Sequence, residues 1–269
     1  MTTQSDEAHR RRSVEAEIEV PGTPEQVWEA IATGPGISAW FVPTEVGERH
    51  GGEIAQHHGA DMDQTGTVTA WEPPHRFAWE TEWQPTPAAS LERTAVEFLV
   101  EARAGGSCVV RVVNSGFGSG ADWDRAVESI RQGWPSALDN LRLYLTYFPG
   151  QHAASFAAGH EATGTADDAW RALAGAVGLG EALAGERLTA QADAPRLAGT
   201  VERVDERQLV LRIDEPGTGF AFLGAGAPGE RPYAFVRAYL YGDDAPTLAA
   251  RAGTDWQAWL DRRFSSSSR

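Results

Sequence analysis

Lysine is missing from this sequence: all 23 basic residues among its 269 residues are arginines. A Schiff-base lysine, a pyridoxal-phosphate anchor and the lysine of a P-loop are therefore excluded. The single cysteine, Cys108, excludes an internal disulfide and any zinc or iron–sulfur site built from several cysteines. Because no histidine partner is evident for Cys108, we expect a buried and unreactive thiol.

Long apolar runs and excess positive charge are also missing. No apolar run approaches the roughly 18 residues of a membrane helix, and the amino-terminus lacks a signal-peptide core, so we expect a cytoplasmic protein without a membrane span. The net charge of −15 is spread over both halves, which argues against a nucleic-acid partner. The ten tryptophans are many for this length, and large aromatic side chains often line apolar cavities.

The amino-terminal part of the chain has the pattern of a strand followed by a short helix. Residues 14–20 alternate apolar side chains with glutamates, which predicts a half-buried strand. Thr23 and Gln26 have the spacing of a capping box, which predicts a helix start. The Gly34-Pro35-Gly36 segment is expected to end that helix.

Several antiparallel strands and one long helix are predicted next. The strands cover residues 66–72, 76–84, 94–103 and 108–114, with a Pro-Pro turn and a Gly-rich turn between them. Apolar residues then recur at spacings of three and four from residue 122 to about 147, which predicts an amphipathic helix. A sheet with one apolar face and a long helix with one apolar stripe predict a curved sheet wrapped around the helix.

The second half of the chain repeats this plan in a weaker and shorter form. The segment Thr165 to Leu173 echoes Thr23 to Ile31, and the segment Arg251 to Phe264 is similar to the chain after Arg131. Gly224-Ala225-Gly226 is interpreted as a turn between strands. We therefore predict two domains, residues 14–150 and a degenerate second copy in 151–264, with disordered tails at 1–13 and 265–269.

Four pieces of the sequence together resemble a known family. They are IEVPGTPEQVWEAI, the following Trp40-Phe41-Val42-Pro43, the hairpin TGTVTAWEPPHRFAWE, and the long helix with Gly133-Trp134 and Leu138. This order is similar to the SRPBCC (START/birch-pollen-allergen-like) superfamily, in the branch named after the ATPase activator of the ninety-kilodalton heat-shock chaperone. The resemblance covers residues 14–148. It implies an α+β helix-grip fold, here as a tandem pair, and binding of an apolar small molecule or lipid.

The alternation of the strands, together with the resemblance, predicts the residues that would meet such a ligand. The expected ligand-binding side chains of the amino-terminal domain are Trp40, Phe41, Trp71, Phe77, Trp79, Trp83, Phe98, Val112, Asn114, Trp134 and Leu138. The alternative is that these side chains simply fill the core. No cofactor is implied.

Other functions remain open at this point. Some members of the family cyclise or dehydrate polyketides, which would require an acid–base group inside the pocket. A chaperone or regulator interaction module, or a homodimer, is also compatible with the acidic surface. His57 and His58 lie near Asp61 and Asp63, but neighbouring strand residues point to opposite faces, so solvated histidines are expected rather than a metal site.

Overall fold

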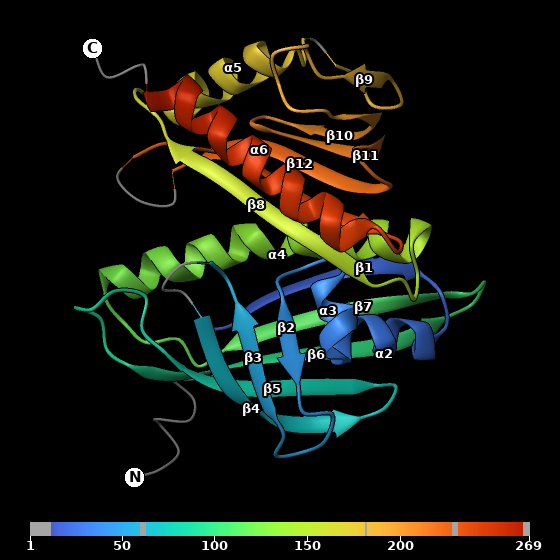
Figure 1. The fold of residues 1–269 in the computed structure, drawn as a ribbon. Helices are drawn as coiled ribbons and strands as arrows, with labels where there is room; N and C mark the ends of the chain where they lie inside the picture. Colours follow the sequence, from blue (N-terminus) through green and yellow to red (C-terminus); the bar gives the residue numbers. More distant parts are fainter. Residues whose placement is uncertain (1–11, 60–62, 181, 228–230, 266–269) are drawn as a thin grey trace. The chain divides into compact units, whose positions relative to one another are not determined.

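The computed structural model describes residues 12–59, 63–180, 182–227 and 231–265. The chain divides into two compact units, Met1–His152 (unit 1) and Ala153–Arg269 (unit 2), which Figure 1 shows. Most of the two predicted tails, residues 1–11 and 266–269, lies outside the described residues, as does Asp61. Arg12 belonged to a predicted tail, but its guanidinium pairs with the carboxylate of Asp124 in unit 1.

Unit 1 contains the predicted strands and helices in the predicted order, together with one further short helix and two further strands. It begins with β1 (Val14–Pro21), α2 (Pro24–Ala32), α3 (Gly34–Ser38) and β2 (Thr44–Val46). There follow β3 (Glu53–His57), β4 (Asp63–Glu72), β5 (Arg76–Trp83), β6 (Glu92–Arg103), β7 (Ser107–Ser115) and α4 (Ala121–Tyr147). The strands form one antiparallel sheet in the order β1-β7-β6-β5-β4-β3-β2.

The start of unit 1 shows why its two helices meet as they do. The capping box is confirmed: the backbone N–H of Thr23 donates to Gln26 Oε1 at 2.9 Å, and Thr23 Oγ1 accepts from the backbone of Gln26. The expected helix stop is a boundary between two helices, because α3 begins at Gly34. A Cβ on Gly36 would lie 1.9 Å from the carbonyl oxygen of Glu29, so only glycine permits this approach.

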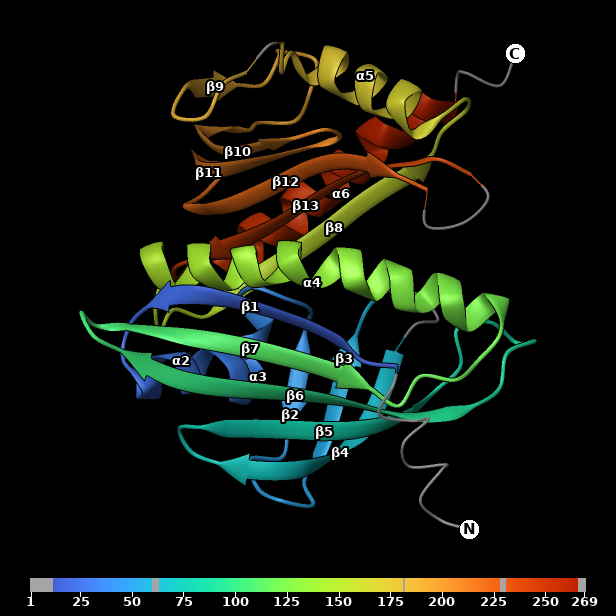
Figure 2. The ribbon, with the colours of Figure 1, turned by 180° about the vertical axis from the view of Figure 1, so that it is seen from behind.

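Helix α4 packs on one face of the sheet, which we call the inner face. This face carries Phe77, Trp79 and Phe98, and the ring of Trp134 from α4 lies 5.7 Å from that of Phe98. Helix α2 contributes Trp28, whose ring lies 6.4 Å from that of Phe77. Figure 2 looks at unit 1 from behind, with α4 alongside β1. The predicted helix-grip arrangement is confirmed.

Unit 2 repeats this topology in a shortened form. Its elements are β8 (Ala153–Glu161), α5 (Ala166–Val177), β9 (Arg187–Thr189), β10 (Ala198–Asp205), β11 (Gln208–Glu215), β12 (Gly219–Gly226), β13 (Tyr233–Tyr241) and α6 (Ala245–Ser265). The strand order is β8-β13-β12-β11-β10-β9, so the first strand again pairs with the last. The described sheet has six strands, against seven in unit 1. A tandem α+β helix-grip protein with a shorter second copy is therefore confirmed.

One local prediction in unit 2 is wrong. Gly224-Ala225-Gly226 is not a turn but the end of β12, paired with Phe235, Ala234 and Tyr233 of β13. Glycines were interpreted as turn residues, whereas here the ring of Phe235 lies where a Cβ of Gly224 would stand. None of the helices in the described part of the chain has the length and apolar character that a membrane span requires.

Candidate functional site

The inner face of unit 1 brings most of the predicted aromatic side chains together. The strand register places Trp71 opposite Phe77 and Trp79 opposite Val96, so alternate residues of neighbouring strands share this face. Ring centroids follow one another at 5.7 Å from Trp71 to Phe77, 5.2 Å from Phe77 to Trp79 and 6.0 Å from Trp79 to Phe98. These spacings are those of rings in contact.

The segment after α3 adds two rings to this aromatic cluster. Trp40 is 2% exposed, and its indole Nε1 donates to the carbonyl oxygen of Ala30 at 2.9 Å, which holds the segment against α2. Phe41 lies stacked on Trp134 with ring centroids 5.9 Å apart. Phe41 remains half-buried, and His58 meets its ring edge-on at 6.0 Å. The predicted Trp40-Phe41 pair thus joins the aromatic cluster.

Four other predicted residues lie outside this series of ring contacts. Val112 and Leu138 are buried apolar residues, Val112 on β7 opposite Phe98. Asn114 is 6% exposed, and its Nδ2 donates to the carbonyl oxygen of Ala95 at 2.9 Å. Trp83 is separated from the main cluster and lies instead against Trp123 of α4, with ring centroids 5.1 Å apart.

The inner face changes from aromatic to polar towards the start of β4 and the end of β5. Its buried polar residues are Thr44, Gln56, Thr81, Thr94 and Asn114. The hydroxyls of the threonines donate to backbone carbonyls, for example Thr44 Oγ1 to Val42 O at 2.8 Å. Gln56 is 5% exposed, and its Nε2 has no hydrogen-bond partner. Such a buried donor costs about 1–3 kcal/mol.

Sequence reasoning missed Gln56 for a local reason. None of the strands predicted above covers Gln56, but Glu53–His57 forms β3, paired with β2 on one side and β4 on the other. Alternation of Ile54 and Gln56 on one face was the available signal. The same strand directs His57 to the other face, where it pairs with Asp63 at 2.8 Å and stays exposed.

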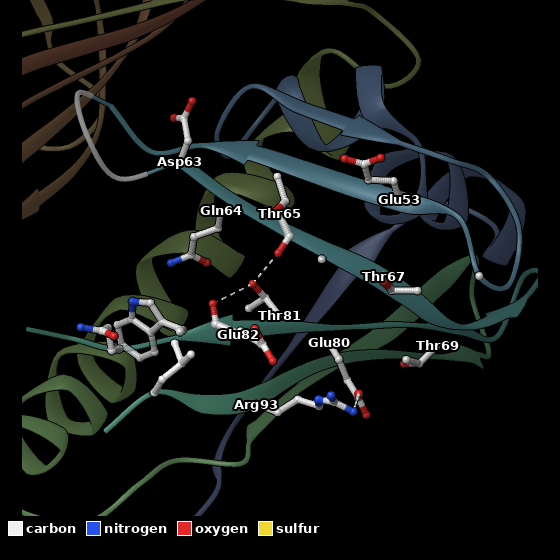
Figure 3. Close-up of a pocket in the computed structure, with 15 residues that line it drawn as sticks. Glu53, Asp63, Gln64, Thr65, Thr67, Thr69, Glu80, Thr81, Glu82 and Arg93 are labelled. Atoms are coloured by element: carbon white, nitrogen blue, oxygen red, sulfur yellow. Dashed lines mark hydrogen bonds and ion pairs between the residues drawn. The ribbon is translucent and has the colours of Figure 1, made fainter. Parts of the chain in front are cut away.

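The sheet forks where β4 and β5 separate. Their pairing begins at Gly66 opposite Thr81, so in the described register residues 63–65 pair only with β3. Thr81 Oγ1 donates to the carbonyl oxygen of Thr65 at 2.6 Å and closes the fork. A depression of about 1070 Å³ opens there (Figure 3). Its lining is mainly polar and includes Gln64 of the inner face. Of the predicted ligand-binding side chains, Trp83 alone lines this depression.

The charged side chains at the rim of this depression lie on the outer face of the sheet, because they alternate with inner-face residues such as Gln64 and Thr81. They are Glu53, Asp63, Glu80, Glu82 and Arg93. Figure 3 shows Arg93 beside Glu80, and an ion pair of 3.8 Å joins their side chains. Four carboxylates against one guanidinium leave the rim acidic, which disfavours an anionic ligand at this opening.

The inner face offers few side chains that could act as an acid, a base or a metal ligand. The buried polar side chains of the described residues are amides and hydroxyls, with no carboxylate, imidazole or guanidinium among them. The described residues contain no group of three or more metal-ligating side chains. Burial raises the pKa of the Cys108 thiol, so the thiolate is disfavoured. The thiol donates a hydrogen bond to the carbonyl oxygen of Gly22.

Comparison with known proteins gives a family and several similar structures. Residues 21–146 match the family described as "Activator of Hsp90 ATPase homolog 1-like protein". Protein MLL2253 from Mesorhizobium loti is 25% identical over 51% of this chain and 98% of its own, with a TM-score of 0.45. DynU16, from the dynemicin biosynthetic locus, is 17% identical over 95% of this chain and 99% of its own, with a TM-score of 0.44. The di-domain ARO/CYC BexL from the BE-7585A biosynthetic pathway is 15% identical over 95% and 94%, with a TM-score of 0.46. No curated protein matches the chain.

Proposed function

Because residues 21–146 match the family described as "Activator of Hsp90 ATPase homolog 1-like protein", we propose that unit 1 binds an apolar small molecule or lipid. The binding surface is the aromatic cluster between the inner face of the sheet and α4. We assign it to the domain of residues 14–150 and regard 151–264 as a degenerate copy without this role.

One observation carries the proposal. Aromatic side chains from β4, β5, β6, α4 and the segment after α3 converge on one surface, and two of them, Phe41 and Trp71, stay half-buried. A ligand that covers such rings removes apolar surface from water at about 25 cal/mol per Å². A cyclase or dehydratase reaction is not proposed, because it requires a positioned acid or base, and the buried polar residues described on this face are amides and hydroxyls.

The proposal is tested with the uncharged apolar dye N-phenyl-1-naphthylamine and the full chain. We expect saturable binding of one dye with a blue-shifted emission. Phe41→Ala removes one partly exposed ring and should weaken binding about tenfold. Phe156→Ala is the matched control, because Phe156 is an equally half-buried phenylalanine in unit 2. Absence of saturable binding, or equal losses in both variants, would refute the proposal.

A further inference from the structure

The amide end of Gln56 identifies the kind of apolar molecule that unit 1 accepts. We infer that the ligand carries an uncharged oxygen, a ketone, ester or hydroxyl group, which accepts a hydrogen bond from Gln56 Nε2. This inference rests on the proposed function and names the chemical class of its ligand. Gln56 would thereby determine specificity, while the rings supply apolar contact.

The first argument is the lack of any protein partner for this donor. Gln56 is 5% exposed, and its Nε2 meets no acceptor. Other buried polar groups on the inner face are already engaged, since Thr44 donates to Val42 and Asn114 donates to Ala95. A buried donor that the protein leaves without an acceptor favours any ligand that brings one.

The second argument is the position of Gln56 in the sheet. In the strand register it stands between Thr44 on β2 and Gln64 on β4, so all three share the inner face. Gln64 also lines the depression at the fork between β4 and β5. The amide therefore lies at the polar end of the surface whose other end is aromatic.

The third argument concerns charge. The buried polar side chains described on the inner face are amides and hydroxyls, with no guanidinium among them. A carboxylate or phosphate of the ligand would be buried there without a cationic partner, so the acceptor is a neutral oxygen. The inferred ligand is an oxygenated apolar molecule rather than a pure hydrocarbon or a fatty-acid anion.

Two probes of the same shape test the inference on the full chain. They are 2-acetylnaphthalene, a ketone, and 2-isopropenylnaphthalene, in which a methylene group replaces the carbonyl oxygen. We expect the ketone to bind about tenfold more tightly, as one neutral hydrogen bond would give. Gln56→Met keeps the side-chain length without the amide, and should remove this preference by weakening the ketone alone. The anion 2-naphthoate should bind more weakly than the ketone.

The controls separate this inference from the proposed function. Gln132→Met makes the same change on the exposed surface of α4, where the amide donates to Glu128, and should keep the preference. Unchanged hydrocarbon binding by Gln56→Met shows that the variant is folded. Equal binding of ketone and hydrocarbon, a preference that survives Gln56→Met, or tighter binding of 2-naphthoate would overturn the inference alone. Binding of neither uncharged probe would overturn both the inference and the proposed function.

Discussion

Replacing Gln56 by methionine should stabilise unit 1. The glutamine is 5% exposed and its Nε2 lacks a partner, so folding removes this donor from water without supplying a replacement hydrogen bond. Methionine has a similar length and no donor to satisfy, and it adapts readily to irregular core spaces. We expect the free energy of unfolding of unit 1 to rise by about 1–2 kcal/mol, part of the cost of an unsatisfied buried donor.

Hydrogen exchange of the full chain, followed by mass spectrometry, measures this change in each unit separately. Exchange of the most protected amides in β3, β4 and β5 should slow by about five- to thirtyfold if they exchange through unfolding of unit 1. Peptides from unit 2 serve as an internal reference. The exposed Gln132→Met variant should change the free energy by less than about 0.5 kcal/mol.

A fall in stability, or no change, would refute the reasoning. It would mean that the amide of Gln56 is already hydrogen-bonded in the folded protein, and the inferred ligand contact would lose its main support. A rise in stability together with a lost preference for the ketone would show a residue kept for binding at the expense of stability.

Three further predictions concern local features of the fold. Gly36→Ala would place a Cβ 1.9 Å from a backbone oxygen of α2 and should destabilise unit 1 by at least about 2 kcal/mol. Gly133→Ala has open space around it and should stabilise unit 1 by about 0.5–1 kcal/mol. Thermal unfolding of both variants checks this contrast. Trp40→Phe removes the indole donor that lies 2.9 Å from a carbonyl oxygen of α2 and should lower the free energy of unfolding by about 1–2 kcal/mol. Urea titrations measure this change, and an unchanged midpoint would contradict the prediction. Hydrogen bonds from the N–H and hydroxyl of Thr165 lower the pKa of Asp168 in the folded protein. The ionised carboxylate therefore stabilises the folded state at a pH above the ordinary carboxyl pKa, and this stabilisation is lost as the pH falls through the lowered pKa. Asp168→Asn should therefore destabilise unit 2 at neutral pH but not in strong acid, and an equal effect at both pH values would refute this assignment.

Local chemistry explains why much of unit 1 could be predicted. The capping box at Thr23 and Gln26 requires only residues three apart, and the structure confirms it. Alternation places Phe77 and Trp79 on one face because successive side chains of a strand point to opposite sides. Trp83 lies on the same face by the same rule, but near the fork, where it meets Trp123 of α4 rather than the main aromatic cluster.

The sequence by itself determined the order of the main strands and helices and the apolar face of each, because these depend on periodicity within a few residues. Only the tertiary structure decided where the pairing of β4 with β5 begins and which buried polar atoms find partners. The acceptors of Thr81 and Asn114 belong to neighbouring strands. Hydrogen bonds of this kind depend on register between distant segments, and no local pattern in the chain encodes that register.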